Sequence, residues 1–277
     1  MHSTYSLHKI NSTADFGFSA ADYSRFKFGD GDVARCFGTE LAAGFIAHHL
    51  ELCSANEQLV VLSSPYSFIP TATFTLKSHF VAVINRWLAG NNRPVVQESK
   101  VHRTITYKED YGELNAEERL GLIGNDSFHV DKAFLKGKTL VFLDDIRITG
   151  GHERMIKKMI NEYELDNKVY MLYFAELINH KIHPSVENYL NYFSVQNIFD
   201  LDEIINCGNF SINTRIVKYI LNYEHESFCV FLQNKPELFI NQLYDMALGN
   251  SYHNMESYQL NLNYLKNQLS KNYKNLA

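Results

Sequence analysis

Long apolar segments are missing from this sequence, since no run approaches the roughly 20 apolar residues that a membrane-spanning helix requires. The N-terminus also lacks the basic stretch followed by an apolar run that marks a secretory signal peptide. Cysteine is scarce: the 277 residues include only four, widely spaced and without a Cys-x-x-Cys pair. That pattern predicts reduced, mostly buried thiols and argues against a disulfide framework or a zinc site. Together these absences predict a cytoplasmic protein.

An excess of positive charge is missing as well. The formal net charge is −5, which argues against general attraction to nucleic acid or to an anionic membrane, so neither is expected as a partner. The hydrophobic fraction of 45% is enough for a substantial core and argues against wholesale disorder. A chain of 277 residues accommodates one large α/β domain, or a core domain with a helical extension.

The most informative segment that is present runs from residue 139 to residue 152. Its apolar residues 140–143 predict a buried strand, and the carboxylates of Asp144 and Asp145 are expected at the C-terminal end of that strand. A Thr-Gly-Gly turn follows at 149–151, and an amphipathic helix is predicted after it. An acidic strand end followed by a glycine turn occurs in many α/β proteins, but this complete order of parts also suits a specific ligand.

The turn is suited to a phosphate. Gly150 and Gly151 can adopt backbone angles that aim successive N–H groups into one concavity. The helix that begins near His152 adds unsatisfied N–H groups and the positive end of its dipole. Asp144 and Asp145 are placed to accept hydrogen bonds from the vicinal hydroxyls of a ribose. The segment therefore predicts a site for a phosphorylated sugar.

This segment resembles the phosphoribosyl-pyrophosphate (PRPP) binding motif of type I phosphoribosyltransferases, in which a hydrophobic strand and two acids precede a short loop ending in Thr-Gly. The resemblance implies an α/β fold with a parallel-sheet core and helices on both faces. It also implies that Asp144 and Asp145 act in catalysis by holding the ribose hydroxyls and the hydration shell of a Mg²⁺ cofactor. The residues of the segment that it assigns to substrate binding are Arg147, Thr149, Gly150, Gly151 and His152. Arg147, Ile148 and His152 depart from the residues that are common in the family.

A second strand and its loop complete the predicted site. Residues 59–63 form a compact apolar strand, and a loop over 64–71 connects it to a helix predicted over 72–88. In the resembled family the loop at this place binds pyrophosphate through backbone N–H groups, and the hydroxyls of Ser63, Ser64 and Ser67 fit that role. The loop has no Arg or Lys, so Mg²⁺ is expected to neutralise the pyrophosphate. A plain strand-to-helix connection is the alternative.

Residues 94–97 predict the next strand, and residues 98–118 form a polar, basic and aromatic excursion of poor periodicity. We interpret this excursion as a long mobile loop. In the resembled family a flexible loop at this place closes over the active site, excludes water and supplies cations to the departing pyrophosphate. The cations expected in this role are Lys100, His102, Arg103 and Lys108. A solvated hairpin is the alternative.

The rest of the first 200 residues predicts more of an α/β layer structure. Residues 26–31 indicate a turn, Asp32 is expected to cap a helix that ends near residue 49, and residues 169–174 form a further apolar strand. Strand–helix–strand units with buried strands imply a parallel sheet covered on both faces. Ligand sites in such sheets lie beyond the C-terminal strand ends.

After about residue 200 helical patterns dominate, with helices predicted over 213–223, 236–249 and 255–269. We therefore predict a phosphoribosyltransferase-like α/β domain over residues 1–200 and a helical extension or cap over residues 201–277.

The resemblance predicts a Mg²⁺-dependent phosphoribosyltransferase, which transfers phosphoribosyl from PRPP to a nitrogenous acceptor and releases pyrophosphate. The acceptor is an unidentified small molecule, and a homodimer is possible because dimers are common among relatives. Ile148 stands where 6-oxopurine phosphoribosyltransferases place an acid, which argues against hypoxanthine or guanine as the acceptor. Two other interpretations stay open: a non-catalytic regulatory protein of the same fold that binds PRPP or a nucleotide, and an unrelated α/β protein.

Overall fold

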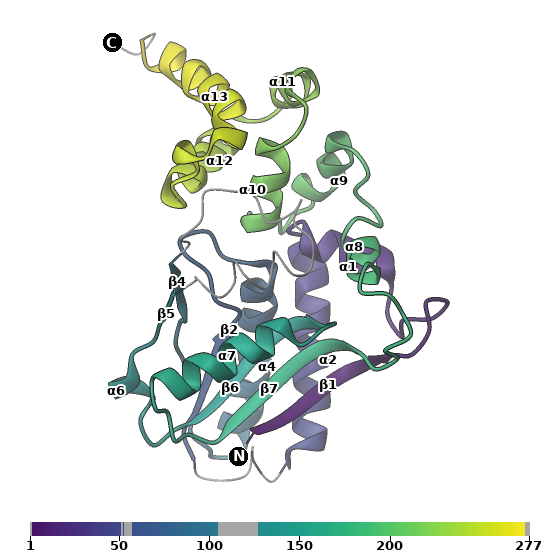
Figure 1. Cartoon of the computed structure of the whole chain (residues 1–277), viewed down its shortest axis with the longest axis vertical. Coiled ribbons are helices and arrows are strands. Elements are labelled where there is room, and N and C mark those ends of the chain that lie inside the picture. Colours follow the sequence, from purple (N-terminus) through teal and green to yellow (C-terminus); the bar gives the residue numbers. More distant parts are fainter. Residues whose placement is uncertain (1, 51, 53–56, 105–126, 275–277) are drawn as a thin grey trace.

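The computed structural model describes residues 2–50, 52, 57–104 and 127–274. Its centre is a five-stranded sheet in the order β1-β7-β6-β2-β3, and every neighbouring pair of strands in it is parallel (Figure 1). The strands are β1 (His2–Ile10), β2 (Leu59–Ser63), β3 (Gln97–Glu98), β6 (Thr139–Arg147) and β7 (Val169–Leu177). The predicted α/β class with a parallel sheet is confirmed.

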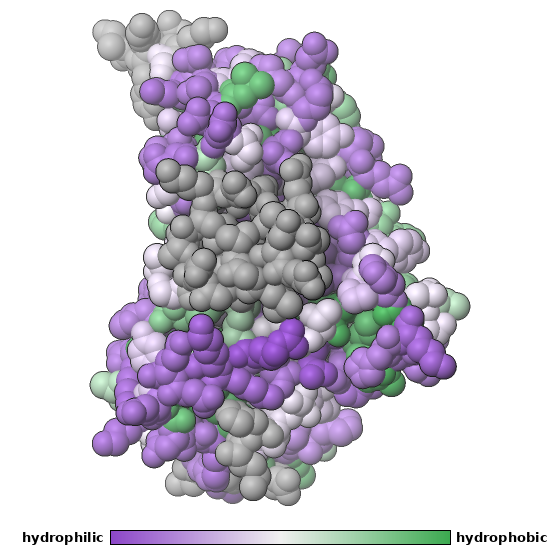
Figure 2. Space-filling model, in the orientation of Figure 1, coloured by the Kyte–Doolittle hydropathy of each residue, from purple (hydrophilic) through white to green (hydrophobic). Residues whose placement is uncertain are grey.

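Both faces of the sheet are covered by helices, as predicted. On one face α2 (Gly31–His48) and α4 (Ala72–Gly90) pack against Val141 and Leu143 of β6. On the other face α7 (Gly151–Glu162) packs against Leu140 and Phe142, because alternate residues of a strand point to opposite sides. Figure 2 shows a predominantly hydrophilic outer surface over α7, as expected for an amphipathic helix that buries only its inner stripe.

The N-terminal segment differs from the prediction. Residues 2–10 form the edge strand β1, whose partly exposed residues give no continuous apolar run for sequence analysis to detect. Residues 26 and 27 are not part of a turn but close α1 (Ala20–Lys27), which Ser19 caps. Asp30, rather than Asp32, caps α2, since its side chain accepts bonds from the N–H groups of residues 32 and 33, each at 3.1 Å.

The strand predicted over residues 140–143 is longer in the structure, because β6 continues to Arg147. The equally long β7 explains the extension: Asp144 pairs with Tyr173 and Arg147 pairs with Glu176. Asp144 and Asp145 therefore lie inside the strand rather than at its C-terminal end, and as successive strand residues they point to opposite faces.

The region between β2 and β6 is only partly described. The strand predicted over 94–97 is shorter and begins later, at Gln97, as an edge strand of two residues. Two short strands, β4 (His102–Thr104) and β5 (Ser127–His129), form an antiparallel pair, and α6 (Lys132–Leu135) follows. The predicted excursion over 98–118 is thus described only as far as Thr104.

The helical extension lies beyond the C-terminal ends of the parallel strands (Figure 1). It follows α8 (Val186–Asn191) and a 3-10 turn (Ile198–Asp200). Its helices are α9 (Leu201–Ile205), α10 (Thr214–Leu221), α11 (His225–Gln233), α12 (Glu237–Gly249) and α13 (Glu256–Lys274), with a 3-10 turn (Tyr252–Asn254) before the last. They share a hydrophobic core that also includes Phe28 and Ile69, so the extension is packed onto the α/β part. The last residue of α12 agrees with the helix predicted over 236–249. The helix α10 is shorter than the predicted 213–223, and α13 is longer than the predicted 255–269.

Three cysteines are described, and all are free thiols. Cys36 is exposed, while Cys207 and Cys229 are half-buried, so the expectation of mostly buried thiols is wrong for these positions. Within the described part of the chain, no helix has the length and apolar character needed to cross a bilayer.

Candidate functional site

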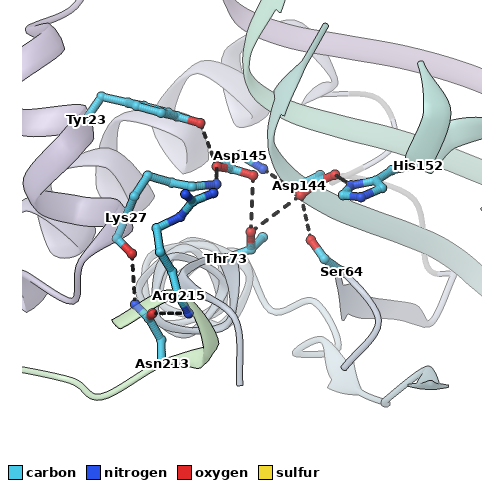
Figure 3. Close-up of polar contacts among 9 residues, drawn as sticks. All are labelled: Tyr23, Lys27, Ser64, Thr73, Asp144, Asp145, His152, Asn213 and Arg215. Carbon is cyan, nitrogen blue, oxygen red and sulfur yellow. Dashed lines mark hydrogen bonds and ion pairs between the residues drawn. The ribbon is translucent and has the colours of Figure 1, made fainter. Parts of the chain in front are cut away.

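The predicted acids lie where the ends of β2 and β6 meet the first turns of α4 and α7 (Figure 3). Thr73 in the first turn of α4 stands between them, with its hydroxyl 3.4 Å from Oδ1 of Asp144 and 3.4 Å from Oδ1 of Asp145. Because the two carboxylates leave the strand in opposite directions, each has its own set of further partners.

Asp144 contacts the 64–71 loop and the start of α7. Its Oδ1 accepts a bond from the Ser64 hydroxyl at 2.5 Å, and its Oδ2 is 2.9 Å from Nδ1 of His152. Asp144, Ser64, His152 and Tyr173 are among the residues that line a small recess at this point. Partial burial lowers the pKa of the His152 imidazole, whose side chain is still 59% exposed, but the carboxylate of Asp144 outweighs it and the net pKa is raised.

Asp145 is buried against α1. Its Oδ2 accepts a bond of 2.7 Å from the Tyr23 hydroxyl and forms an ion pair with Lys27 (Figure 3). Burial raises the pKa of Asp145, but the Lys27 ammonium and the Tyr23 hydroxyl outweigh it and hold that pKa well below its usual range. Burial, followed by the charge of Asp145, raises the pKa of Tyr23 well above its ordinary value. Asp145 is thus fully occupied by protein groups.

Of the two glycines in the turn, Gly150 is left-handed and Gly151 is the first residue of α7. Gly150 has φ of +70° and is the N-cap of α7, so the first N–H groups of that helix open toward this turn. A Cβ at Gly150 would stand 3.6 Å from Nη2 of Arg147 and 3.7 Å from Nη1 of Arg154. Arg154 also donates a bond of 2.8 Å to the carbonyl of Thr149. Two guanidinium groups and a helix N-terminus therefore surround the turn, an arrangement that favours an anion.

Sequence analysis missed Arg154, and it assigned Arg147 to substrate on the motif alone. In the structure Arg147 donates to Glu153 at 2.6 Å and to Glu176 at 2.6 Å. Lys157 forms a second ion pair with Glu153. Arg147 therefore holds β6, β7 and α7 together while its Nη2 stays near the turn.

The 64–71 loop and the start of the basic excursion lie together. The Lys100 ammonium donates to the carbonyl of Ser67 at 2.5 Å and stands 3.9 Å from the centre of the Tyr66 ring. The N–H of Arg103 donates to the carbonyl of Tyr66 at 3.2 Å. Burial, and then the charges of Lys100 and His129, lower the pKa of His102. Ser63 is buried at the strand end, and Lys108 lies outside the described residues.

The helical extension also reaches this place. Asn213 caps α10 by accepting bonds from two backbone N–H groups, and its Nδ2 donates to the carbonyl of Lys27 at 3.2 Å. Figure 3 shows the Arg215 side chain extending from α10 toward Lys27 and Asp145. The positive charge of Arg215 counteracts part of the rise in the pKa of Tyr23. Asn213 is the first residue of the helix predicted over 213–223, whereas no local pattern marks a role for Lys27 or Arg215.

The acids can be tested as ligands for Mg²⁺, which binds proteins through one or two carboxylates together with substrate phosphates and water. Asp144 fits, because its side chain is 12% exposed and it lines the recess. Asp145 fits only if Lys27 moves away. The described residues contain no group of three His, Cys, Asp or Glu side chains arranged to hold a metal ion. A bound substrate would have to supply most of the ligands.

The comparisons with solved structures give neighbours of low similarity. A hypoxanthine phosphoribosyltransferase from Staphylococcus aureus is 9% identical, with a TM-score of 0.34 over 52% of this chain and 74% of that chain. A phosphoribosylpyrophosphate synthetase from Mycobacterium smegmatis is 21% identical, with a TM-score of 0.26 over 50% of this chain and 33% of that chain. A hypoxanthine phosphoribosyltransferase variant from Trypanosoma cruzi, complexed with IMP, is 14% identical, with a TM-score of 0.30 over 56% of this chain and 80% of that chain.

No curated protein matches the chain. The family model described as PRTase ComF-like matches residues 1–265, which is nearly the whole sequence and includes most of the helical extension. This match confirms the resemblance to phosphoribosyltransferases, and the chain belongs to the PRTase ComF-like family.

Proposed function

We propose that this protein is a Mg²⁺-dependent phosphoribosyltransferase that uses PRPP. The observation that carries the proposal is the position of Asp144 beside the glycine turn, with the left-handed Gly150 and the start of α7 next to it. A ribose 5-phosphate needs such a neighbourhood, since its phosphate takes N–H groups and cations while its hydroxyls take a carboxylate.

In this proposal the 5′-phosphate lies at the N-terminus of α7, between the glycine turn and Arg154. Asp144 accepts hydrogen bonds from the ribose hydroxyls, and His152 orients its carboxylate. Ser64, Ser67 and Lys100 face the pyrophosphate. Asp144, together with the phosphates of PRPP, would hold Mg²⁺, and the ion would supply positive charge to the leaving group.

The nitrogenous acceptor attacks C1 of the ribose as pyrophosphate departs. Positive charge develops on the ribose in this step and negative charge on the leaving group, so catalysis depends on orientation and on cations near the pyrophosphate. Lys100, held 3.9 Å over the Tyr66 ring, is the described cation that is best placed for this task.

One observation favours a second function, a regulatory protein that binds PRPP or a nucleotide without catalysis. Asp145 is neutralised by Lys27 and accepts a bond from Tyr23, so one of the two predicted acids is compensated without metal or sugar. A site of this kind can bind the ligand through Asp144 and the glycine turn alone.

The test measures binding and pyrophosphate release separately. Calorimetry with PRPP, with and without Mg²⁺, is run on the wild type, on Asp144→Asn and on Asp245→Asn, an exposed Asp of α12 that serves as control. Loss of a charge-assisted hydrogen bond should weaken binding about 10- to 100-fold in Asp144→Asn only. Binding with release of pyrophosphate on adding nitrogenous bases supports the enzyme, and binding without release supports the regulatory protein. If wild type and both variants show no PRPP affinity, the proposed function is wrong.

A further inference from the structure

The 64–71 loop is held by the helical extension. The Oδ1 of Asn250, directly after α12, accepts hydrogen bonds from the backbone N–H groups of Phe68 at 2.9 Å and Ile69 at 3.1 Å. One side chain, about 180 residues away in the sequence, thus takes two neighbouring backbone donors of the loop.

The orientation of the Asn250 amide is determined by the loop, because its two backbone N–H groups are donors only and require the oxygen Oδ1. The Nδ2 then donates to the hydroxyl of Tyr252 at 3.0 Å. Tyr252 is fully buried in the core of the extension, where its ring lies 5.0 Å from that of Tyr258. The loop is therefore tied, through the half-buried Asn250, to a residue of the buried core of the extension.

Two further contacts act on the same loop. At Gly249 the ring of Phe68 approaches so closely that a Cβ there would stand 2.1 Å from it. The hydroxyl of Thr214, at the start of α10, donates to the carbonyl of Ile69 at 2.8 Å, and the N–H of Thr214 donates to the carbonyl of Pro70 at 2.9 Å. The C-terminal half of the loop is thus held by α10 and by the end of α12.

We propose that the helical extension positions the 64–71 loop for the pyrophosphate of the ligand, with Asn250 as the main positioning residue. The pyrophosphate part rests on the proposed function. The backbone N–H groups of Phe68 and Ile69 already donate to Asn250. The pyrophosphate is therefore expected to bind to the earlier part of the loop, Ser64–Ser67. The loop has no Arg or Lys, so its affinity for an anion depends on how accurately its backbone is held.

The experiment compares three variants. Asn250→Ala removes both acceptor bonds to the loop, whereas Asn250→Asp keeps an oxygen acceptor for the two N–H groups and should keep their slow exchange, while its added negative charge opposes anion binding. Asn254→Ala is the matched control, because Asn254 is exposed and lies four positions further along the chain. Circular dichroism and thermal melting show which variants are folded.

The first measurement is the Kd of pyrophosphate, PRPP and ribose 5-phosphate with Mg²⁺. Asn250→Ala should bind pyrophosphate and PRPP about 10-fold more weakly, while ribose 5-phosphate affinity stays within about twofold, because its phosphate lies at α7 and not at the loop. Unchanged pyrophosphate affinity, or an equal loss for all three ligands, would overturn the positioning role.

The second measurement is independent of PRPP chemistry. Hydrogen exchange of the amides of Phe68 and Ile69 should be slow in the wild type, in Asn250→Asp and in Asn254→Ala, and about 10-fold or more faster in Asn250→Ala. If the wild type binds none of the three ligands, the proposed function fails, while faster exchange in Asn250→Ala alone still supports the positioning of the loop. If the exchange rates of all four proteins are the same, the extension does not hold the loop, whatever the ligand.

Discussion

The ammonium of Lys27 and the carboxylate of Asp145 form a buried ion pair across 118 residues of sequence. The Lys27 side chain is 12% exposed and that of Asp145 is 7% exposed, so both charges have lost most of their water. A buried charge is tolerated when a partner and hydrogen bonds compensate it, and here Tyr23 and Thr73 complete the set. This pair links α1 to the strand that carries the motif.

Lys27→Met should destabilise the protein by about 3–5 kcal/mol near neutral pH, because it leaves the Asp145 carboxylate buried without its cation. In the wild type the lowered pKa of Asp145 stabilises the fold at pH values above the unfolded pKa of about 4, and this stabilisation is lost as the pH falls below it. In the variant, burial is no longer opposed by a cation and only hydrogen bonds such as that from Tyr23 remain, so the pKa of Asp145 rises, the ionised group opposes folding and protonation relieves it. The loss of stability in Lys27→Met, relative to the wild type, should therefore become smaller as the pH is lowered from about 7 to about 5.

Urea unfolding at both pH values measures this effect. Lys168→Met is the control, since Lys168 pairs with Glu57 at the surface, with side chains 61% and 41% exposed, and should cost much less stability than Lys27→Met. Equal costs for the two variants, or a Lys27→Met deficit that does not change with pH, would contradict the assignment of Asp145 as a buried ionised group.

Gly150→Val should abolish binding of ribose 5-phosphate. The φ of +70° at Gly150 is costly for a β-branched residue, and the side chain would crowd the guanidinium groups of Arg147 and Arg154. Gly137→Val is the matched control: Gly137 has φ of +73° but has open space around it, in the connection between α6 and β6. Both variants should lose about 1–3 kcal/mol of stability, and only the first should lose the ligand. Similar affinities in the two variants would mean that the glycine turn does not bind phosphate.

We expect no efficient transfer of phosphoribosyl to hypoxanthine or guanine. Ile148, directly before the Thr-Gly of the motif, packs against the main hydrophobic core and has no group that takes or gives a proton. General acid–base help is worth about 10²–10⁴-fold in rate, so its absence should be visible in an assay of nucleotide formation with PRPP and Mg²⁺. Turnover of about 1 s⁻¹ or faster on either purine would show this inference to be wrong.

Asn261→Ala should destabilise the helical extension by about 2–4 kcal/mol. Asn261 is 3% exposed, and its Nδ2 donates to the carbonyls of Leu221 and Tyr223, both at 2.9 Å, while its Oδ1 is 2.7 Å from Nδ1 of His225. Truncation leaves these buried groups without partners. Asn263→Ala on the exposed side of α13 should change the free energy of unfolding by less than about 0.5 kcal/mol. Thermal and urea unfolding of both variants measure the difference.

Local signals were strong where one segment carried a complete pattern. The apolar run of β2 was predicted with its observed bounds, and the glycine turn and the start of α7 lie where the Thr-Gly-Gly sequence placed them. The left-handed Gly150 is a local requirement that a single residue type satisfies, so sequence analysis detects it. The acids were assigned to the correct strand but not to its interior, because the length of β6 depends on its pairing with β7.

Long-range contacts decided the rest. The length of β6 and the exposed pattern of β1 depend on neighbouring strands that a local reading does not include. Lys27 and Asn250 occur in segments without a recognisable motif, and their partners only become evident when α1 and the helical extension meet the edge of the sheet.

By itself, the sequence determined the α/β class, the parallel core and the segment that resembles a PRPP site, because periodicity and turn chemistry act over a few residues. Only the tertiary structure decided that Asp144 faces the recess while Asp145 is buried against Lys27. It also decided that Asn250 of the extension takes two N–H groups of the 64–71 loop. The physical reason is that burial and pairing depend on which surfaces the folded chain brings together, and residues 118 or 182 positions apart carry no local record of that contact.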